Sequence, residues 1–233
     1  MKYIIKGDND CPVIEITLNN QEVVKIERGS MAYMSNVQIE GKLNSSRKGL
    51  SGMLGAIGRS LTSGESMFIT HATGLSNNAI LGVAPAIPGK VKCLNLDASH
   101  QYYLNTGAFV ACDDTVDYQM VSQKASKAFF GGTGGFFIMQ TTGYGDMIIN
   151  GFGDIIEMDV TPNQPLTVDN DHVLAWETSL DYSIKVASGT FGFTSGEGLV
   201  DEFYGSGKVY IQTRNIQNLA QVLIPYLPTS NNS

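Results

Sequence analysis

The pattern in this sequence that most resembles a ligand-binding site is a pair of glycine-rich stretches. GGTGG spans Gly131 to Gly135, and GYGDMIINGFGD spans Gly143 to Asp154. Such loops bind phosphate when they lead into a helix N-terminus, because its free N–H groups and dipole favour an anion. Here strand-like residues follow Gly145, and the chain contains no G-K-[ST] motif. We therefore interpret the glycines as turn residues and predict no cofactor.

The three histidines lack the spacing of a metal site. His71, His100 and His172 lie far apart, with no H-x-H or H-E-x-x-H pattern. His71 falls where two other segments carry Gln140 and Gln212, which favours a hydrogen-bonding strand residue. A metal site would require His71 and His172 to converge with an acid, and nothing in the sequence predicts this.

Two glutamates and two arginines, with His71, form a candidate polar site. Glu65 and Glu197 each lie between small residues ahead of an expected strand. Arg59 and Arg214 could bind a carboxylate or phosphate through two hydrogen bonds. A catalytic carboxylate needs a paired acid or base, or burial that shifts its pKa, and neither follows from the sequence. We favour ion pairs among these residues or capping roles at turns.

Serine-hydrolase chemistry is poorly supported. The nucleophile elbow has the pattern G-x-S-x-G. The nearest match, GFTSG from Gly192 to Gly196, has its serine one position late. We therefore rank an enzymatic function, such as a hydrolase, lowest.

The segment RKGLSGMLGAIGRSL, Arg47 to Leu61, is the best candidate for an interaction surface. Its apolar residues follow a helical stripe, and glycines every third residue weaken a helix by ~1 kcal/mol each while permitting close approach. Three interpretations stay open: a lid on the body, a self-association surface and a membrane-facing surface, although its three basic residues are few for stable anchoring. The stripe consists of Leu50, Met53, Leu54, Ile57 and Leu61.

Composition and charge narrow the class of protein. The 233 residues are 42% hydrophobic and only 16% charged, with 26 glycines, which is typical of many short strands joined by tight turns. The net charge of −7 argues against nucleic-acid binding, which requires a basic surface. Three widely spaced cysteines, no signal peptide and no run of ~18 apolar residues lead us to expect a cytoplasmic protein without an integral membrane segment.

The elements that would position these residues form a threefold pattern. Three blocks align without a gap, at Pro12–Met34, Lys90–Cys112 and Asp154–Trp176, with apolar residues at every second position in the matched strands. Ahead of them lie short apolar strands at Tyr3–Ile5, Ile80–Leu81 and Ile148–Ile149.

We therefore predict one compact all-β protein of three β-sandwich modules around a pseudo-threefold axis. The repeats would span residues 1–77, 78–145 and 146–215. A short helix, capped by Asn215, would follow over 216–227, and residues 228–233 would form a disordered tail.

The segments FFIMQTTGYGDMII, LTVDNDHVLAWETSLDY, GEGLVDEFYGSGKVYIQTRN and GRSLTSGESMFITHATG carry a resemblance. In their order along nearly the whole chain they resemble the mitochondrial-biogenesis family named for altered inheritance of mitochondria. The resemblance implies a fold like that of the tryptophan RNA-binding attenuation protein, in the double-stranded β-helix class. Eukaryotic members are linked to the mitochondrial inner membrane, but this chain lacks a transit peptide and the basic residues that RNA binding requires.

We predict a non-enzymatic scaffold or assembly protein that forms a homo-oligomer, with peripheral membrane contact left open. The alternative, from a different class, is a small-ligand-binding protein with a pocket between modules. An exposed apolar patch would favour the scaffold, whereas a deep pocket with convergent polar side chains would favour the ligand-binding protein. The sequence does not identify the small molecule.

Overall fold

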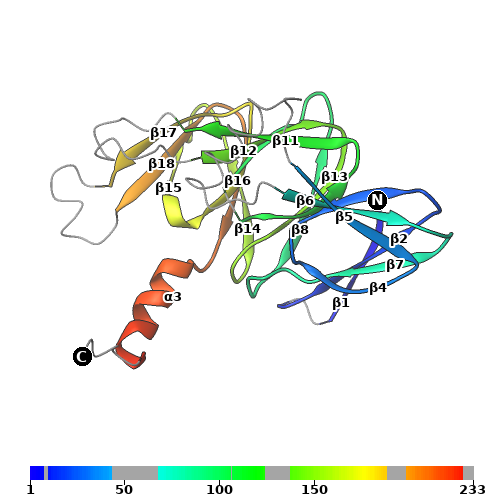
Figure 1. Cartoon of the computed structure of the whole chain (residues 1–233). Helices are drawn as coiled ribbons and strands as arrows, with labels where there is room; N and C mark the ends of the chain where they lie inside the picture. The colour runs from blue at the N-terminus through cyan, green and yellow to red at the C-terminus, as the bar shows by residue number, and fades with distance from the viewer. Residues whose placement is uncertain (8–9, 44–67, 106, 124–136, 188–197, 228–233) are drawn as a thin grey trace.

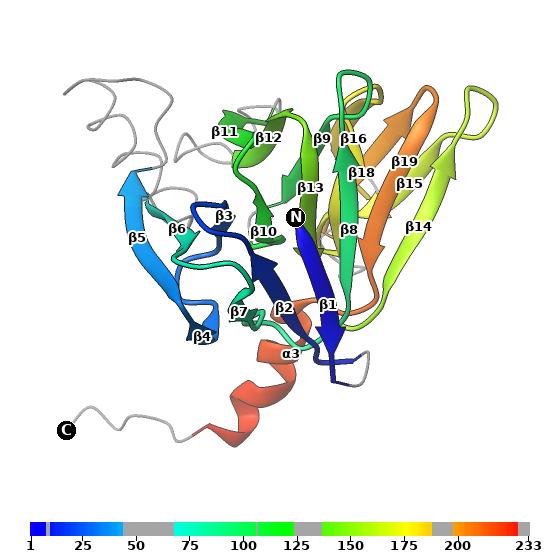
Figure 2. The ribbon, with the colours of Figure 1, turned by 90° about the vertical axis from the view of Figure 1, so that its right-hand side faces the viewer.

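The computed structural model is predominantly β, as the sequence predicts. It describes residues 1–7, 10–43, 68–105, 107–123, 137–187 and 198–227. The expected interaction segment Arg47–Leu61, the tail 228–233, Glu65 and Glu197 lie outside these residues. Figures 1 and 2 show the sheets side by side, with one short helix projecting from them.

Four sheets follow one another through the described part of the chain, and every strand pairing within them is antiparallel. The first has the order β1 (Lys2–Lys6), β2 (Val13–Leu18), β7 (Ala79–Val83), β4 (Met31–Ser35). The second has the order β5 (Val37–Leu43), β6 (Phe68–Gly74), β3 (Val23–Ile26), β10 (Phe109–Asp113), β13 (Gly145–Asn150), β8 (Val91–Leu96).

The third sheet has the order β11 (Val116–Ser122), β12 (Phe137–Gly143), β9 (Tyr102–Asn105), β16 (Val173–Glu177), β19 (Gly207–Gln212), β14 (Ile155–Val160). The fourth has the order β15 (Leu166–Asp169), β18 (Leu199–Tyr204), β17 (Asp181–Val186). The short helices are η1 (Asn170–His172), α3 (Ile216–Leu223) and η3 (Ile224–Tyr226).

Three apolar cores fill the spaces between successive sheets. In β2, Ile14, Ile16 and Leu18 are fully buried while the residues between them are partly exposed, so the predicted alternation gives this strand one core-facing side. The middle strands β10 and β16 are buried over most of their length, because each has an apolar core on both faces of its sheet. Trp176 lies in the third core with its ring 5.6 Å from that of Phe203.

Matched residues of the three aligned blocks occupy matched places in strand pairs. Ile16 lies opposite Leu81, Leu94 opposite Met147, and Met158 opposite Val209. A bulge interrupts the pairing at the same step in each block, between Met31 and Tyr33, Phe109 and Ala111, and Val173 and Ala175. The predicted threefold axis is not confirmed, since β4 and β15 are edges of separate sheets.

Two of the predicted equivalences are wrong. Tyr3–Ile5 belong to β1, an extra strand on the far side of β2 from β7, whereas Ile80–Leu81 and Ile148–Ile149 belong to β7 and β13. Gln212 lies in β19, whereas His71 and Gln140 lie in β6 and β12. The residue that matches them is Glu202 of β18, opposite Thr167 as His71 is opposite Lys25. β6 and β19 each follow a glycine and alternate apolar with polar residues, so the sequence pattern alone does not distinguish them.

Candidate functional site

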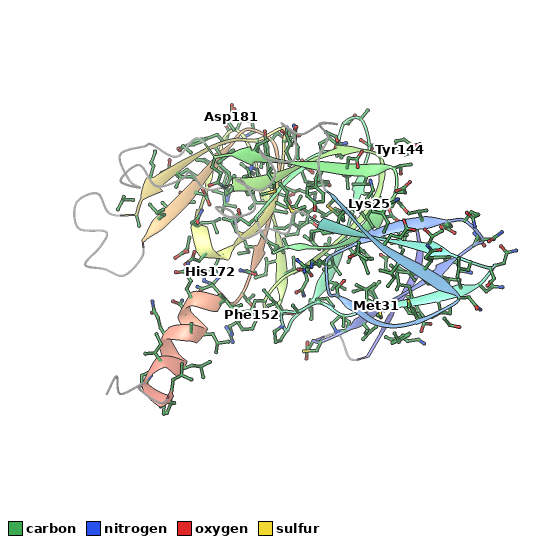
Figure 3. The ribbon with its side chains drawn as sticks, viewed as in Figure 1. Lys25, Met31, Tyr144, Phe152, His172 and Asp181 are labelled. Carbon is green, nitrogen blue, oxygen red and sulfur yellow. The ribbon has the colours of Figure 1, made fainter. Side chains whose placement is uncertain are left out.

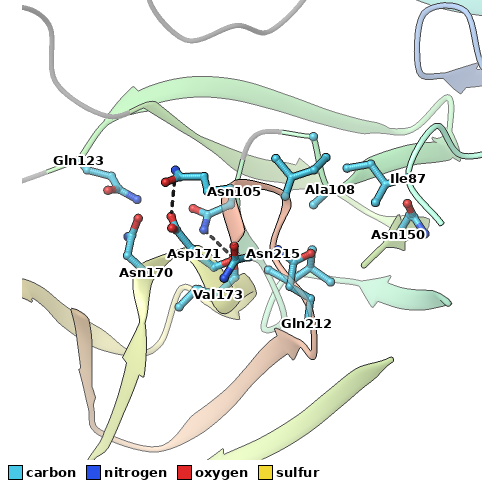
Figure 4. A pocket seen from close by; sticks show the side chains of 14 residues that line it. Ile87, Asn105, Ala108, Gln123, Asn150, Asn170, Asp171, Val173, Gln212 and Asn215 are labelled. Carbon is cyan, nitrogen blue, oxygen red and sulfur yellow. Dashed lines mark hydrogen bonds between the residues drawn. The ribbon is translucent and has the colours of Figure 1, made fainter. Parts of the chain in front are cut away.

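A pocket lined by carboxamide side chains lies where the second and third sheets meet the start of α3 (Figure 4). The cavity holds about 330 Å³. Its apolar wall includes Ile87, Ala108, Val173 and Leu174. Its polar side chains are those of Asn105, Gln123, Asn150, Asn170, Asp171, Gln212, Asn215 and Gln217.

The direction of the strands brings these amides together. β9 and β19 both pair antiparallel with β16, so they run in the same direction. Their last residues, Asn105 and Gln212, therefore lie at the same end of the strands of the third sheet. Asn150 ends β13 in the second sheet, and Asn170 begins η1. Asn and Gln at strand ends hydrogen-bond easily to nearby backbone, which explains why amides gather there.

Hydrogen bonds fix the orientation of three of these amides. The Nδ2 atom of Asn105 donates to Val173 O at 2.6 Å, and that of Asn150 donates to Lys90 O at 3.1 Å. Asn170 Nδ2 donates to Asp201 Oδ2 at 2.8 Å. Because a backbone carbonyl can only accept, Asn105 and Asn150 must present their nitrogens to the protein, and the oxygen of each is the atom left to accept a further hydrogen bond.

His172 joins η1 to the end of β19 and the cap of α3 (Figure 3). Its Nδ1 lies 2.7 Å from Gln212 O, and its Nε2 lies 3.1 Å from Asn215 Nδ2. The carbonyl can only accept and the amide nitrogen can only donate, which assigns a neutral ring protonated at Nδ1. His172 is thus a structural residue.

Two carboxyl groups at the pocket have raised pKa values. Burial raises the pKa of Asp171, the ionisable residue of the described lining, and the nearby Asp169 charge adds to this. Behind Asn170, burial raises the pKa of Asp201 to about 6, with the Asn170 hydrogen bond opposing the shift. Asp201 Oδ1 has no hydrogen-bond partner among the described residues. Asp171 therefore lines the pocket itself, whereas Asp201 lies behind it and holds the Asn170 amide.

The lining favours binding over catalysis. The described residues that line the pocket include no Ser, Cys, Lys, Arg or His, so Asp171 has no second ionisable side chain among them with which to form an acid–base pair. Amide oxygens and one carboxyl group suit a ligand rich in O–H or N–H donors, such as a polyol or an amine. The apolar wall would pack against the carbon skeleton of such a ligand.

A second hollow, between β8 and β14, holds paired charges. Glu157 accepts from Lys92 at 2.9 Å and also from Lys208, and Lys92 lies 5.6 Å from the centre of the Tyr210 ring. These lysine contacts lower the pKa of Glu157. Because both lysines are already paired with a carboxylate, we interpret this group as an ion-pair network that joins two strands.

The predicted polar site is not assembled by the residues that can be described. His71 lies in β6, with Nδ1 3.8 Å from Asp114 Oδ1, and its pKa is lowered by burial and by the positive charges of Lys42 and Lys25. Arg214 follows β19, is exposed and contacts Thr213 O at 3.4 Å. The structure places these two in different sheets and does not bring them together. Arg59, Glu65 and Glu197 lie outside the described residues, as do Leu50, Met53, Leu54, Ile57 and Leu61.

Sequence reasoning missed the amide pocket. Its side chains come from strand ends, a short 3₁₀ helix and a helix cap, with no common spacing along the chain. Only the Asn215 cap and the polar turns gave a local signal. The described residues contain no group of three or more His, Cys, Asp or Glu side chains placed to hold a metal ion. Within that same part of the chain, no helix is both long and apolar enough to span a membrane.

Comparison with known proteins places the chain in a family. A family model described as mitochondrial biogenesis AIM24 matches residues 3–214. An uncharacterized protein of Streptococcus pyogenes serotype M6 is 42% identical over 234 residues, covering 100% of this chain and 93% of that protein. A crystal structure of a Streptococcus pyogenes protein, a structural genomics target, matches with a TM-score of 0.77 and 38% identity, over 97% of this chain and 99% of that one. The chain therefore belongs to the AIM24 mitochondrial biogenesis family.

Proposed function

We propose that this protein is a non-enzymatic scaffold that works by self-association. The observation that carries the proposal is that β4, a strand of largely apolar residues, is exposed to solvent. Every residue of β4, with the sequence MAYMS, is exposed, and Met31, Tyr33 and Met34 are 39%, 40% and 47% exposed. Figure 3 labels Met31 at this outer strand.

The helix at the end of the described chain adds a second apolar surface. α3 and η3 bury none of their residues. Their exposed apolar side chains are those of Ile216, Leu219, Val222, Leu223, Ile224, Tyr226 and Leu227. Contiguous apolar surface of this kind marks an interaction site more often than a free surface, because removing it from water stabilises a complex by about 25 cal/mol per Å².

The polar groups support a scaffold over an enzyme. Asp171 is the one ionisable side chain among the described lining residues of the amide pocket, so it has no acid–base partner there, and the Lys92–Glu157–Lys208 network has its charges paired. A cytoplasmic location is part of the proposal. The three free cysteines, Cys11, Cys93 and Cys112, support it because a reducing compartment keeps thiols unpaired.

Light scattering on the purified protein tests self-association. We expect a mass above the 25.1 kDa of one chain, falling toward that value on dilution by mass action. Near-physiological salt should be used because it screens interactions between exposed charges, so that apolar contacts determine the measured mass. A mass of one chain at every concentration, with a folded circular dichroism spectrum, would contradict the scaffold.

The amide pocket favours a second candidate function, binding of a small polar ligand between the sheets. Its fixed acceptor oxygens and its volume of about 330 Å³ suit a donor-rich molecule such as a polyol. This function is compatible with self-association, because the pocket and β4 are separate surfaces. A small molecule retained by protein from its own source would support it.

A further inference from the structure

Two joints between neighbouring β-sandwiches have the same construction. In the second sheet β10 pairs with β3, and Ala111 lies opposite Ile26. In the third sheet β16 pairs with β9, and Ala175 lies opposite Leu104. At each joint, the second strand of one aligned block pairs with the third strand of the next block.

The first and the last aligned block each contain one strand that matches a joint strand but has no joint partner in the described chain. β4 is the third strand of the first block and pairs with β7 on one side only in the described chain. β15 is the second strand of the last block and likewise pairs with β18 only. Figures 1 and 2 both show the two strands well apart, at opposite ends of the series. A single chain of this shape does not pair them.

Burial shows what β4 lacks. The first four residues of β10 and of β16 are buried, whereas all five residues of β4 are exposed. The three strands have the same place in their blocks and a bulge at the same step. The difference arises because β10 and β16 each contribute residues to two of the apolar cores, whereas β4 contributes to none and has no module beside it in the described chain.

Charges protect the other sheet edges but not this pair. Each of the six other edge strands carries a charged residue away from its last position: Lys2 in β1, Glu40 in β5, Lys92 in β8, Asp117 in β11, Glu157 in β14 and Lys185 in β17. β4 has no charged residue, and β15 has only Asp169, its last residue. Charges on an edge strand prevent pairing with another chain. Their absence leaves these two edges open to it.

We propose that β4 of one copy pairs antiparallel with β15 of a second copy, head to tail. The block alignment sets the register. Tyr33 matches Ala111 and Ala175, and Val168 matches Ile26 and Leu104, so Tyr33 lies opposite Val168 and Met34 opposite Thr167. This inference rests on the proposed self-association and names the surfaces that carry it. Because the two surfaces differ, repeated pairing yields a ring or a filament.

Within each module, the third strand of the block places one small residue opposite one large residue. Ala111 lies opposite Ile148 of β13, and Ala175 lies opposite Tyr210 of β19. In β4 the order is reversed, since Tyr33 lies over Gly82, where an added Cβ would be 2.5 Å from its ring. The Tyr33 hydroxyl donates to Glu15 at 2.7 Å, which holds the ring across the sheet. The strand pair thus keeps one large residue beside one small residue.

The backbone of Met34 faces the open edge. At the two joints, Glu27 N donates to Val110 O and Thr178 N donates to Gln101 O, both at 2.8 Å. Antiparallel pairs alternate between hydrogen-bonded and non-hydrogen-bonded, so the pairs two residues on, Cys112–Lys25 and Trp176–Tyr103, are hydrogen-bonded as well. Met34 and Thr167 match these pairs, and their N–H and C=O groups point outward.

Mixed cysteine variants test the register. Met34→Cys and Thr167→Cys would each be made in a Cys11→Ser background, which removes the exposed native thiol. Both positions are exposed, so neither change disturbs a core. Oxidation of an equal mixture should give a cross-linked dimer that contains one of each variant, because hydrogen-bonded partners lie ~5.5 Å apart at Cα, within disulfide reach. Each variant alone should remain largely uncross-linked, since the proposed joint pairs unlike edges.

A proline variant tests the backbone contact. Met34→Pro removes the outward N–H, and an edge strand tolerates this in the free chain. Met34→Leu keeps the N–H and is the matched control. We expect the light-scattering mass to fall to that of one chain for Met34→Pro and to stay oligomeric for Met34→Leu, with both variants folded by circular dichroism.

The outcomes separate this inference from the proposed function. If the wild type is oligomeric but the mixture does not cross-link and Met34→Pro keeps its mass, the β4–β15 joint is wrong while self-association stands. If the double variant Met34→Cys/Thr167→Cys forms its disulfide within one chain, the joint closes inside the molecule and the second-copy pairing is overturned. A wild type that is monomeric at all concentrations overturns both.

Discussion

Burial has a larger effect on the pKa of Asp201 than its hydrogen bond to Asn170 has. Its side chain is 1% exposed, and burial raises its pKa to about 6. An acid whose folded pKa exceeds its ordinary value of ~3.9 stabilises the fold when protonated. This contribution is complete below about pH 4 and is lost as the pH rises through about 6.

The variant Asp201→Asn should remove this pH dependence. At about pH 8 its free energy of unfolding should be about 3 kcal/mol higher than that of the wild type, because the wild type must keep a buried charge there. Urea unfolding at about pH 5 and pH 8 measures the difference. Asp181→Asn, at an exposed position of β17, is the matched control. An equal pH dependence in Asp201→Asn and the wild type would show that another group is responsible.

Single residues were the hardest level to predict from sequence. Asn105, Asn150 and Asn170 lie around one pocket only because β9 and β13 end near the start of η1. Nothing in their spacing indicates this, since the contacts are long-range. His172 gave no signal in the sequence either, and its partners, Gln212 O and Asn215 Nδ2, are both distant from it along the chain.

At the scale of elements, α3 depends on one cap. Asn215 Oδ1 accepts from Asn218 N at 2.8 Å, as the sequence predicts, and Asn215 Nδ2 contacts His172 Nε2. Asn215→Ala should destabilise α3 by about 1 kcal/mol, since an uncapped helix start leaves N–H groups without acceptors. Hydrogen exchange of the α3 amides should speed up accordingly.

Asn215→Ser separates the two roles of this residue. Serine caps helices about as well as asparagine but is too short to replace the contact to His172. Exchange in α3 should therefore stay near the wild-type rate in Asn215→Ser. If Ser and Ala accelerate exchange equally, the contact to His172 holds the helix rather than the cap.

Strands were predictable where alternation is strong, and less so where a strand merely looks like another. β2 alternates as VIEITL, which identifies its inward face directly. β19 and β6 both follow a glycine and alternate apolar with polar residues, so their patterns predict the same place in the repeat. Only the pairing of β19 with β14 and β16 distinguishes the two strands. Local pattern identifies a strand, whereas its neighbours follow from long-range contacts that the pattern does not encode.

At the scale of the whole molecule, four sheets of the described chain enclose three cores. Two of the edge strands, β4 and β15, differ from each other and carry no charged residue before their last position. The all-β class followed from glycine content and alternation. The open series did not, because the aligned blocks predict similar units but not whether the last unit reaches the first. Exposure of β4 beside the burial of β10 and β16 is visible only once the sheets are assembled.

A native mass spectrum of the protein purified from its own source tests the central claim, self-association, most directly. It reports the number of chains and any retained small molecule in one measurement. We predict peaks at whole-number multiples of 25.1 kDa, which a head-to-tail scaffold requires. Added mass of one small molecule per chain would support the second function of the amide pocket as well. A single peak at the mass of one chain, under conditions that preserve a known oligomer, would contradict the scaffold.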